Sequence, residues 1–149
     1  MRTKSLTLSV LAYLKLQYMC NAVDVEVGGY GLAKSLAQPL YIDDFVLVQQ
    51  SCNSSYMEFD DLGIANFMED MADLGYSPAQ YARIWIHTHP EMAATPSQTD
   101  ETTFAEKFSD SDWAVMAIIS KTNDTYARYK VNSHISMCER IPWVVDWES

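Results

Sequence analysis

The sequence is poor in the features that mark several specialised protein classes. It contains three cysteines, Cys20, Cys52 and Cys138, which lie far apart and form no CxxC pair. This spacing argues against a disulfide framework and against a thiolate zinc finger. We therefore expect three reduced thiols packed as small apolar groups, and a cytoplasmic location. The apolar run near the N-terminus, Leu6 to Leu14, is too short to span a bilayer, so no membrane partner is expected.

Basic residues are scarce as well. The chain has 10 lysines and arginines against 20 aspartates and glutamates, which gives a formal net charge of -10. Such a surface repels phosphate backbones, so no nucleic-acid partner is expected and a basic or neutral protein or peptide is favoured. Hydrophobic residues make up 48% of the sequence and charged residues 20%, which is typical of a folded domain, here a single one over residues 1–149. The oligomeric state does not follow from these numbers.

The N-terminal segment allows two interpretations. Arg2 and Lys4 ahead of the apolar run resemble the start of a short signal peptide. Against this, apolar residues recur at a spacing of four, as on one face of a helix: Leu6, Val10, Leu14 and Tyr18. The spacing favours an amphipathic helix from about Ser5 to Met19.

Further along the chain, strand patterns alternate with helix patterns. The predicted strands are 24–27 (closed by the glycine-rich 28–31), 40–50, 54–59, 83–87, 113–120 and 125–131. The predicted helices are 60–74, which Gly75 ends, and 99–108. Helices that alternate with strands indicate an α/β fold: a single domain with a mixed β-sheet flanked by helices.

Residues 87–100, HTHPEMAATPSQTD, hold two of the three histidines of the chain. In an extended strand, His87 and His89 point to the same side and Thr88 points away. Two imidazoles and one carboxylate are the usual protein ligands of a catalytic zinc, and Asp100 is the natural third ligand. Such a site keeps its fourth position for water, whose pKa it lowers to about 7.

A hydrolytic site also needs a base, and a polar turn without metal is the competing interpretation. Glu26 is the candidate base, because it is a carboxylate in an otherwise apolar strand that ends in glycines. Ser97 and Asp100 also fit a capping box, with Ser97 as the N-cap of the following helix. The box explains Ser97 and Asp100 without a metal, but it leaves the paired histidines unexplained.

Together these residues resemble a known family motif. Glu26 in VEVGGYG, followed by His87-Thr88-His89-Pro90, six residues, Ser97, two residues and Asp100, looks like the JAMM motif of the MPN (JAB1/MPN/Mov34) metalloproteases, in the form of their compact prokaryotic or phage members. The resemblance covers about residues 5–132 and leaves the tail, 133–149, uncovered. It implies an MPN/JAB-like fold.

The resemblance also implies roles for the matched residues. His87, His89 and Asp100 would bind Zn²⁺, Glu26 would act as general base and then general acid, and Ser97 would donate a hydrogen bond to the oxyanion. The implied reaction is hydrolysis of a peptide or isopeptide bond at the C-terminal tail of a ubiquitin-like or sulfur-carrier-like protein. Two alternatives stay open: a non-catalytic MPN-like scaffold, and a zinc amidohydrolase of small substrates.

Other polar and aromatic residues are expected to have ordinary structural roles. Glu91 and Glu101 flank the motif and are expected to be solvated, and His134 to be a surface or packed histidine. The indoles of Trp143 and Trp147 are expected to pack against the core.

Overall fold

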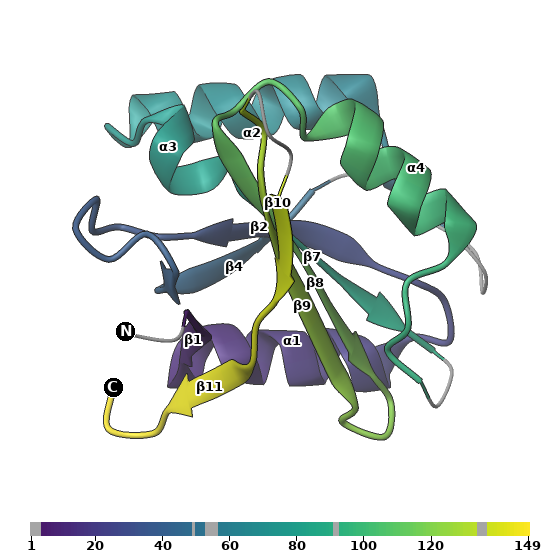
Figure 1. Ribbon diagram of the computed structural model, residues 1–149. Helices are drawn as coiled ribbons and strands as arrows, with labels where there is room; N and C mark the ends of the chain where they lie inside the picture. The colour runs from purple at the N-terminus through teal and green to yellow at the C-terminus, as the bar shows by residue number, and fades with distance from the viewer. Residues whose placement is uncertain (1–3, 49, 53–56, 91–92, 134–136) are drawn as a thin grey trace.

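The computed structural model describes residues 4–48, 50–52, 57–90, 93–133 and 137–149. They form a single α/β domain in which helices cover both faces of a mixed sheet, as predicted (Figure 1). In chain order the elements are β1 (Leu6–Ser9), α1 (Val10–Ala22), β2 (Gly28–Leu32), β3 (Tyr41–Ile42), β4 (Asp44–Leu47), β5 (Gln50–Cys52), β6 (Met57–Phe59), α2 (Asp61–Asp73), α3 (Pro78–Tyr81), β7 (Ile84–His89), α4 (Gln98–Lys107), β8 (Trp113–Ser120), β9 (Thr125–Val131), β10 (Met137–Arg140) and β11 (Trp143–Asp146).

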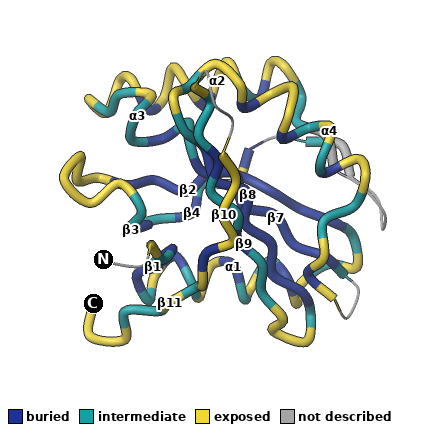
Figure 2. Tube along the Cα trace, viewed as in Figure 1, coloured by how far each residue is buried: buried dark blue, intermediate teal, exposed yellow. Residues whose placement is uncertain are grey.

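The main sheet has the strand order β10-β9-β8-β7-β2-β4. Strands β7 and β8 are parallel and are joined through α4, while the other neighbours are antiparallel. Parallel neighbours need a crossover connection of this kind. Ile84 and Ile86 belong to the core cluster that includes residues of α1, whereas Trp85 belongs to the cluster with residues of α2 and α4. Figure 2 shows the result: the central strands are buried between helices whose outer surfaces are exposed.

The predicted N-terminal helix begins too early. Residues Leu6–Ser9 form β1, which pairs in parallel with β11 and β3, and α1 starts only after Ser9. The Ser9 hydroxyl caps α1 by accepting a hydrogen bond from the Ala12 N–H at 3.1 Å. The predicted stripe is therefore also wrong, since Leu14 and Tyr18 are 55% and 72% exposed. The buried face of α1 is Ala12, Leu16 and Cys20.

The glycine-rich segment is a strand and not the end of one. Strand β2 covers Gly28–Leu32, whereas residues 24–27, predicted as a strand, have no regular structure. A Cβ atom on Gly29 would lie 2.1 Å from the Val46 carbonyl oxygen of β4. Glycine is required here because β4 approaches the backbone of β2 too closely for a side chain.

The predicted strand 40–50 is divided among three sheets. β3 joins β1, β4 forms the edge of the main sheet, and β5 pairs with β6. The predicted strand 54–59 corresponds to β6, with residues 54–56 outside the described part of the chain. The apolar composition of 40–50 predicts extended backbone, but it does not determine that consecutive strands pair with different partners.

The remaining predicted elements are confirmed with small shifts of their ends. Helix α2 is capped by the Asp60 side chain, and Gly75 follows it with a φ of 88°, a left-handed conformation that glycine adopts readily. Strands β8 and β9 have the predicted bounds, while β7 extends to His89 and α4 begins at Gln98. Helix α3 was not predicted.

The C-terminal tail adds strands to both larger sheets. β10 pairs with β9, and β11 pairs with β1. Trp143 packs against the core, as expected, and its indole N–H donates to the Tyr126 carbonyl at 2.9 Å. Trp147 is instead 66% exposed, and its ring lies edge-on to the Tyr13 ring.

The cysteines differ in their burial. Cys20 is a buried free thiol, but Cys138 is exposed, so the expectation of packing was wrong for this cysteine. The side chain of Cys52 lies outside the described part. Within that part, no helix combines the length and apolar character needed to cross a membrane.

Candidate metal centre

Strand β7 places both histidines of the motif on one side of the sheet. All six residues of β7 are buried, and the His87 and His89 ring centroids lie 5.2 Å apart. Thr88, between them, forms two hydrogen bonds with Val27, in the segment before β2. Its N–H donates to the Val27 carbonyl at 2.8 Å, and its hydroxyl accepts from the Val27 N–H at 3.1 Å. The same strand therefore presents two imidazoles and holds the segment next to Glu26.

The first turn of α4 brings Asp100 to the histidines. Ser97 is the N-cap: its hydroxyl accepts from the Asp100 N–H at 3.1 Å, and Asp100 Oδ2 accepts from the Ser97 N–H at 2.9 Å. The same carboxylate lies with Oδ1 3.2 Å from His87 Nε2 and with Oδ2 3.1 Å from His89 Nε2. The capping box and the histidine–aspartate cluster are thus one structure, not alternatives.

The donor atoms of His87, His89 and Asp100 fit a metal ion. One ligand atom from each residue can be chosen so that all three lie within 4.8 Å of one another. Two ligands of one tetrahedral zinc, each about 2.0–2.1 Å from it, lie roughly 3.3 Å apart, close to the distances from Asp100 to the two imidazoles. His87 is fully buried, and among the described residues neither of its ring nitrogens has a hydrogen-bond partner of good geometry. A buried polar atom normally has a partner, which a bound ion or a water molecule would supply here.

The charges of the cluster agree with a cation site. Burial raises the pKa of Asp100, but the neighbouring His87 and His89 outweigh it and hold this pKa well below its usual range. Burial lowers the pKa of His87, so its imidazole is neutral, as a metal ligand must be. Burial also lowers the pKa of His89, but Asp100 and Glu26 overcome this effect and raise it above the usual value, so the two carboxylates favour a positive charge at this position, which a bound cation would supply in place of a proton.

Glu26 reaches the cluster from the segment before β2. Its side chain is buried, and Oε1 lies 3.4 Å from His89 Nε2. The nearby backbone is fixed by Gln50, whose amide accepts from the Gly28 N–H at 2.7 Å and donates to the Gly28 carbonyl at 2.6 Å. The structure therefore brings together all five motif residues, although residues 26 and 87 are far apart in sequence.

Comparison with known proteins agrees with this arrangement. The family model of prokaryotic homologs of the JAB domain matches residues 82–132. Over this segment the chain is similar to prokaryotic homologs of the JAB domain, which supports the resemblance to the JAMM/MPN proteins that the motif indicated. The matched segment is about a third of the chain, covers β7 to β9, and contains His87, His89, Ser97 and Asp100 but not Glu26. No curated protein matches the chain.

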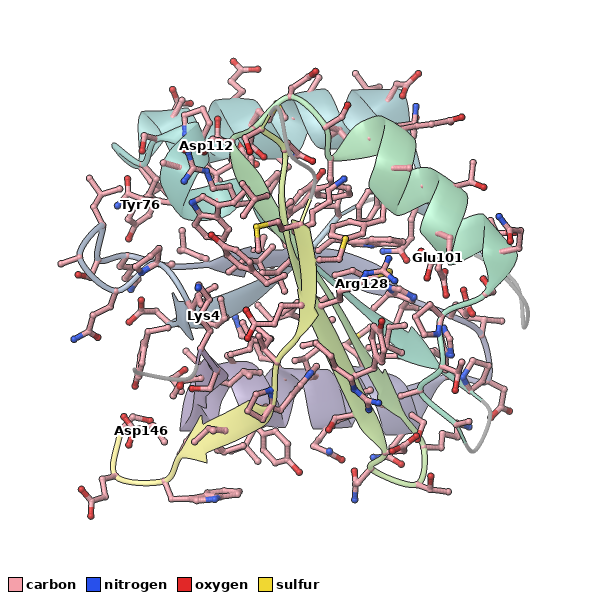
Figure 3. The ribbon with its side chains drawn as sticks, in the orientation of Figure 1. Lys4, Tyr76, Glu101, Asp112, Arg128 and Asp146 are labelled. Atoms are coloured by element: carbon pink, nitrogen blue, oxygen red, sulfur yellow. The ribbon has the colours of Figure 1, made fainter. Side chains whose placement is uncertain are left out.

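Two acidic residues flank the candidate metal centre in the sequence. Glu101 was expected to be solvated, but both of its carboxylate oxygens accept hydrogen bonds from Arg128, at 3.0 and 2.6 Å (Figure 3). Glu91 lies outside the described residues, as does His134, so neither expectation can be compared with the structure.

Sequence reasoning missed two residues that support the centre. Gln50 fixes the backbone beside Glu26, and Asp124 accepts a hydrogen bond from the Ala94 N–H of the loop before α4. Neither residue carries a local signal, because a single amide or carboxylate in a strand or a turn is common. Their roles arise only when distant segments meet.

Proposed function

We propose that this JAB-like domain is a zinc-dependent peptidase or isopeptidase that hydrolyses a bond at the C-terminal tail of a ubiquitin-like or sulfur-carrier-like protein. One observation carries the proposal. A buried His87–His89–Asp100 group lies beside a second buried carboxylate, Glu26, within 3.4 Å of His89. A purely structural zinc site closes the coordination shell with four protein ligands, whereas three ligands plus an adjacent base are typical of a hydrolytic site.

Each group has a distinct chemical role in the proposed reaction. Zinc, when bound, supplies Lewis acidity, which polarises the scissile carbonyl and makes a water molecule acidic near neutral pH. Glu26 accepts the proton of the attacking water and then delivers it to the leaving amine. His87, His89 and Asp100 hold the ion, and Asp100 is itself oriented by the N–H of Ser97.

Ser97 can support the reaction without leaving its capping position. Its oxygen accepts the hydrogen bond from the Asp100 N–H, and this bond does not use the hydroxyl hydrogen. That hydrogen can be donated to the oxyanion that develops on the substrate carbonyl. The helix cap and the proposed oxyanion contact are therefore compatible.

The substrate class is supported by charge and by the family. The formal net charge of -10 favours a neutral or basic partner over an acidic one. The resemblance to JAMM proteases points to a flexible C-terminal tail as the segment that is cleaved.

The test is a Glu26→Gln variant assayed with fusions of small modifier proteins that end in Gly-Gly. Loss of the base should reduce kcat by about 10²–10⁴-fold, while zinc content measured by elemental analysis stays unchanged. Chelation should abolish cleavage, and added zinc should restore it.

The control is Glu106→Gln. Glu106 is exposed on α4, and this substitution removes the same charge as Glu26→Gln. Wild-type protein that binds no zinc would overturn the proposal. Zinc binding without cleavage of any fusion or short amide would favour the scaffold alternative, and cleavage of short amides alone would favour a small-substrate amidohydrolase.

A further inference from the structure

The turn between β8 and β9 lies next to the candidate metal centre. Strands β7 and β8 are parallel, and their register places Ser120 opposite His89, so both strands end at the same edge of the sheet. In the turn, Asn123 has a φ of 63° and the Asp124 N–H donates to the Ser120 hydroxyl at 3.1 Å. The turn thus presents the Asp124 carboxylate to the loop that follows β7.

A single peptide group connects Asp124 to His89. The N–H of Ala94 donates to Asp124 Oδ2 at 2.9 Å, and the carbonyl of Ala93 lies 3.3 Å from His89 Nδ1. These two groups belong to the same peptide unit, which is planar and trans. A carbonyl can only accept, so Nδ1 is the protonated nitrogen in this contact, and Nε2 is the nitrogen that faces Asp100 and Glu26.

We propose that Asp124 is a positioning residue for the metal centre and acts on His89 through the Ala93–Ala94 peptide group. Metal-binding histidines commonly donate their second N–H to a carboxylate or a carbonyl, which fixes the tautomer and raises the basicity of the ligand. Here the carbonyl is itself polarised by a carboxylate at the other end of its peptide group, and successive hydrogen bonds of this kind strengthen one another. The inference depends on the zinc site of the proposed function.

Two properties of the loop support this role. Ala94 is 1% exposed, so the peptide group is at the boundary of the core and not in a loosely held surface turn. The side chain of Asp124 itself is exposed, so its replacement removes one contact without opening a cavity. The carboxylate can therefore be changed with little effect on the fold.

The experiment compares zinc affinity in Asp124→Ala, Asp124→Asn and Asn123→Gly, by competition with a coloured chelator. Loss of an outer partner typically weakens metal binding by about 10–100-fold, so we expect a decrease of at least about 10-fold for Asp124→Ala. Asp124→Asn keeps an oxygen acceptor without the charge, so its zinc affinity should lie between those of Asp124→Ala and the wild type. Asn123→Gly keeps the left-handed backbone of the turn but removes the contact of Asn123 with Gln17, and should bind zinc like wild type.

A second measurement separates positioning from a general loosening of the loop. In the zinc-loaded wild type, the Nδ1–H proton of His89 should give a downfield NMR signal protected from exchange with water, and Asp124→Ala should shift it upfield and speed its exchange. Unchanged affinity and signal in Asp124→Ala would overturn the inference and leave the proposed function intact. Equal losses in Asp124→Ala and Asn123→Gly would also overturn it, since the fold of the turn would then be the cause. Failure of the wild type to bind zinc would instead overturn both.

Discussion

At the scale of single residues, Ser97 and Asp100 each serve two structures. They close the capping box of α4 with bonds of 2.9 and 3.1 Å, and the same Asp100 carboxylate lies against both histidines. Fixing a carboxylate in a helix cap removes its rotamer freedom before any ion binds, so less entropy is lost on binding. A helix N-terminus also favours the negative charge of Asp100.

The two roles of Ser97 can be separated by Ser97→Gly. Glycine at an N-cap position lowers helix stability by only a few tenths of a kcal/mol, but it has no hydroxyl to donate to an oxyanion. We expect the free energy of unfolding to be nearly unchanged and kcat to fall by about 10²–10³-fold. Urea denaturation and steady-state cleavage of a modifier fusion measure the two effects. Ser97→Thr, which keeps a hydroxyl, is the matched control, and full activity of Ser97→Gly would contradict the oxyanion role.

At the scale of elements, the contact between β2 and β4 defines one edge of the main sheet. The register places Gly29 opposite Leu47 and Tyr30 opposite Val46. The backbone of β4 lies so near Gly29 that a Cβ atom would meet the Val46 carbonyl. Strand β2 also pairs with β7 and is bound to Gln50 beside Glu26, so β4 is connected to the metal centre through two consecutive strand pairs.

Gly29→Ala should therefore destabilise the protein strongly. The methyl group meets a backbone oxygen, which cannot rotate away as a side chain can, so we expect a loss of roughly 2–3 kcal/mol in the free energy of unfolding. Urea denaturation measures it. Gly75→Asn is the control: outside its chain neighbours, no atom of the described residues lies within 4 Å of a Cβ there, and asparagine tolerates the positive φ. Equal stability of Gly29→Ala and wild type would show that β4 does not require this approach.

At the scale of the whole molecule, the two ends of the described chain are bound to each other. β1 pairs with β11 from Leu6–Trp143 to Ser9–Asp146, and the Val10 N–H donates to the Ser149 hydroxyl at 2.9 Å (Figure 1). Ile141, just before β11, is 3% exposed and belongs to the core cluster that contains Leu6 and Leu8. The C-terminal tail thus completes the core beneath α1.

Ile141→Ala tests whether the tail contributes to global stability. Removal of a buried isoleucine side chain typically lowers the free energy of unfolding by about 2–5 kcal/mol, because it loses buried area and leaves a cavity. Val144 is 45% exposed on β11, so Val144→Ala should change the free energy of unfolding by about 0.5 kcal/mol or less. Thermal and urea unfolding compare the two variants. A similar small effect for both would mean that the tail docks without supporting the core.

Local patterns determined much of the fold before any contact between distant segments was considered. The apolar run of β8, the alternation in β9 and the Asp60 and Ser97 caps each act within a few residues, and the corresponding elements have nearly the predicted bounds. The two-residue period of a strand is likewise local, so the common direction of His87 and His89 could be predicted from the sequence.

Only the tertiary structure decided which partners these elements meet. Leu6 is predicted in a helix but lies in β1, because β1 pairs with β11. The position of α1 on the sheet buries Ala12 and Leu16 and leaves Leu14 and Tyr18 exposed. The placement of Gln50 beside Glu26, and of Asp124 beside Ala94, likewise joins segments without a local signal. Periodicity and capping are properties of neighbouring residues. Strand partners and buried faces depend instead on contacts across the whole chain, so the sequence alone predicted the motif but not the frame that holds it.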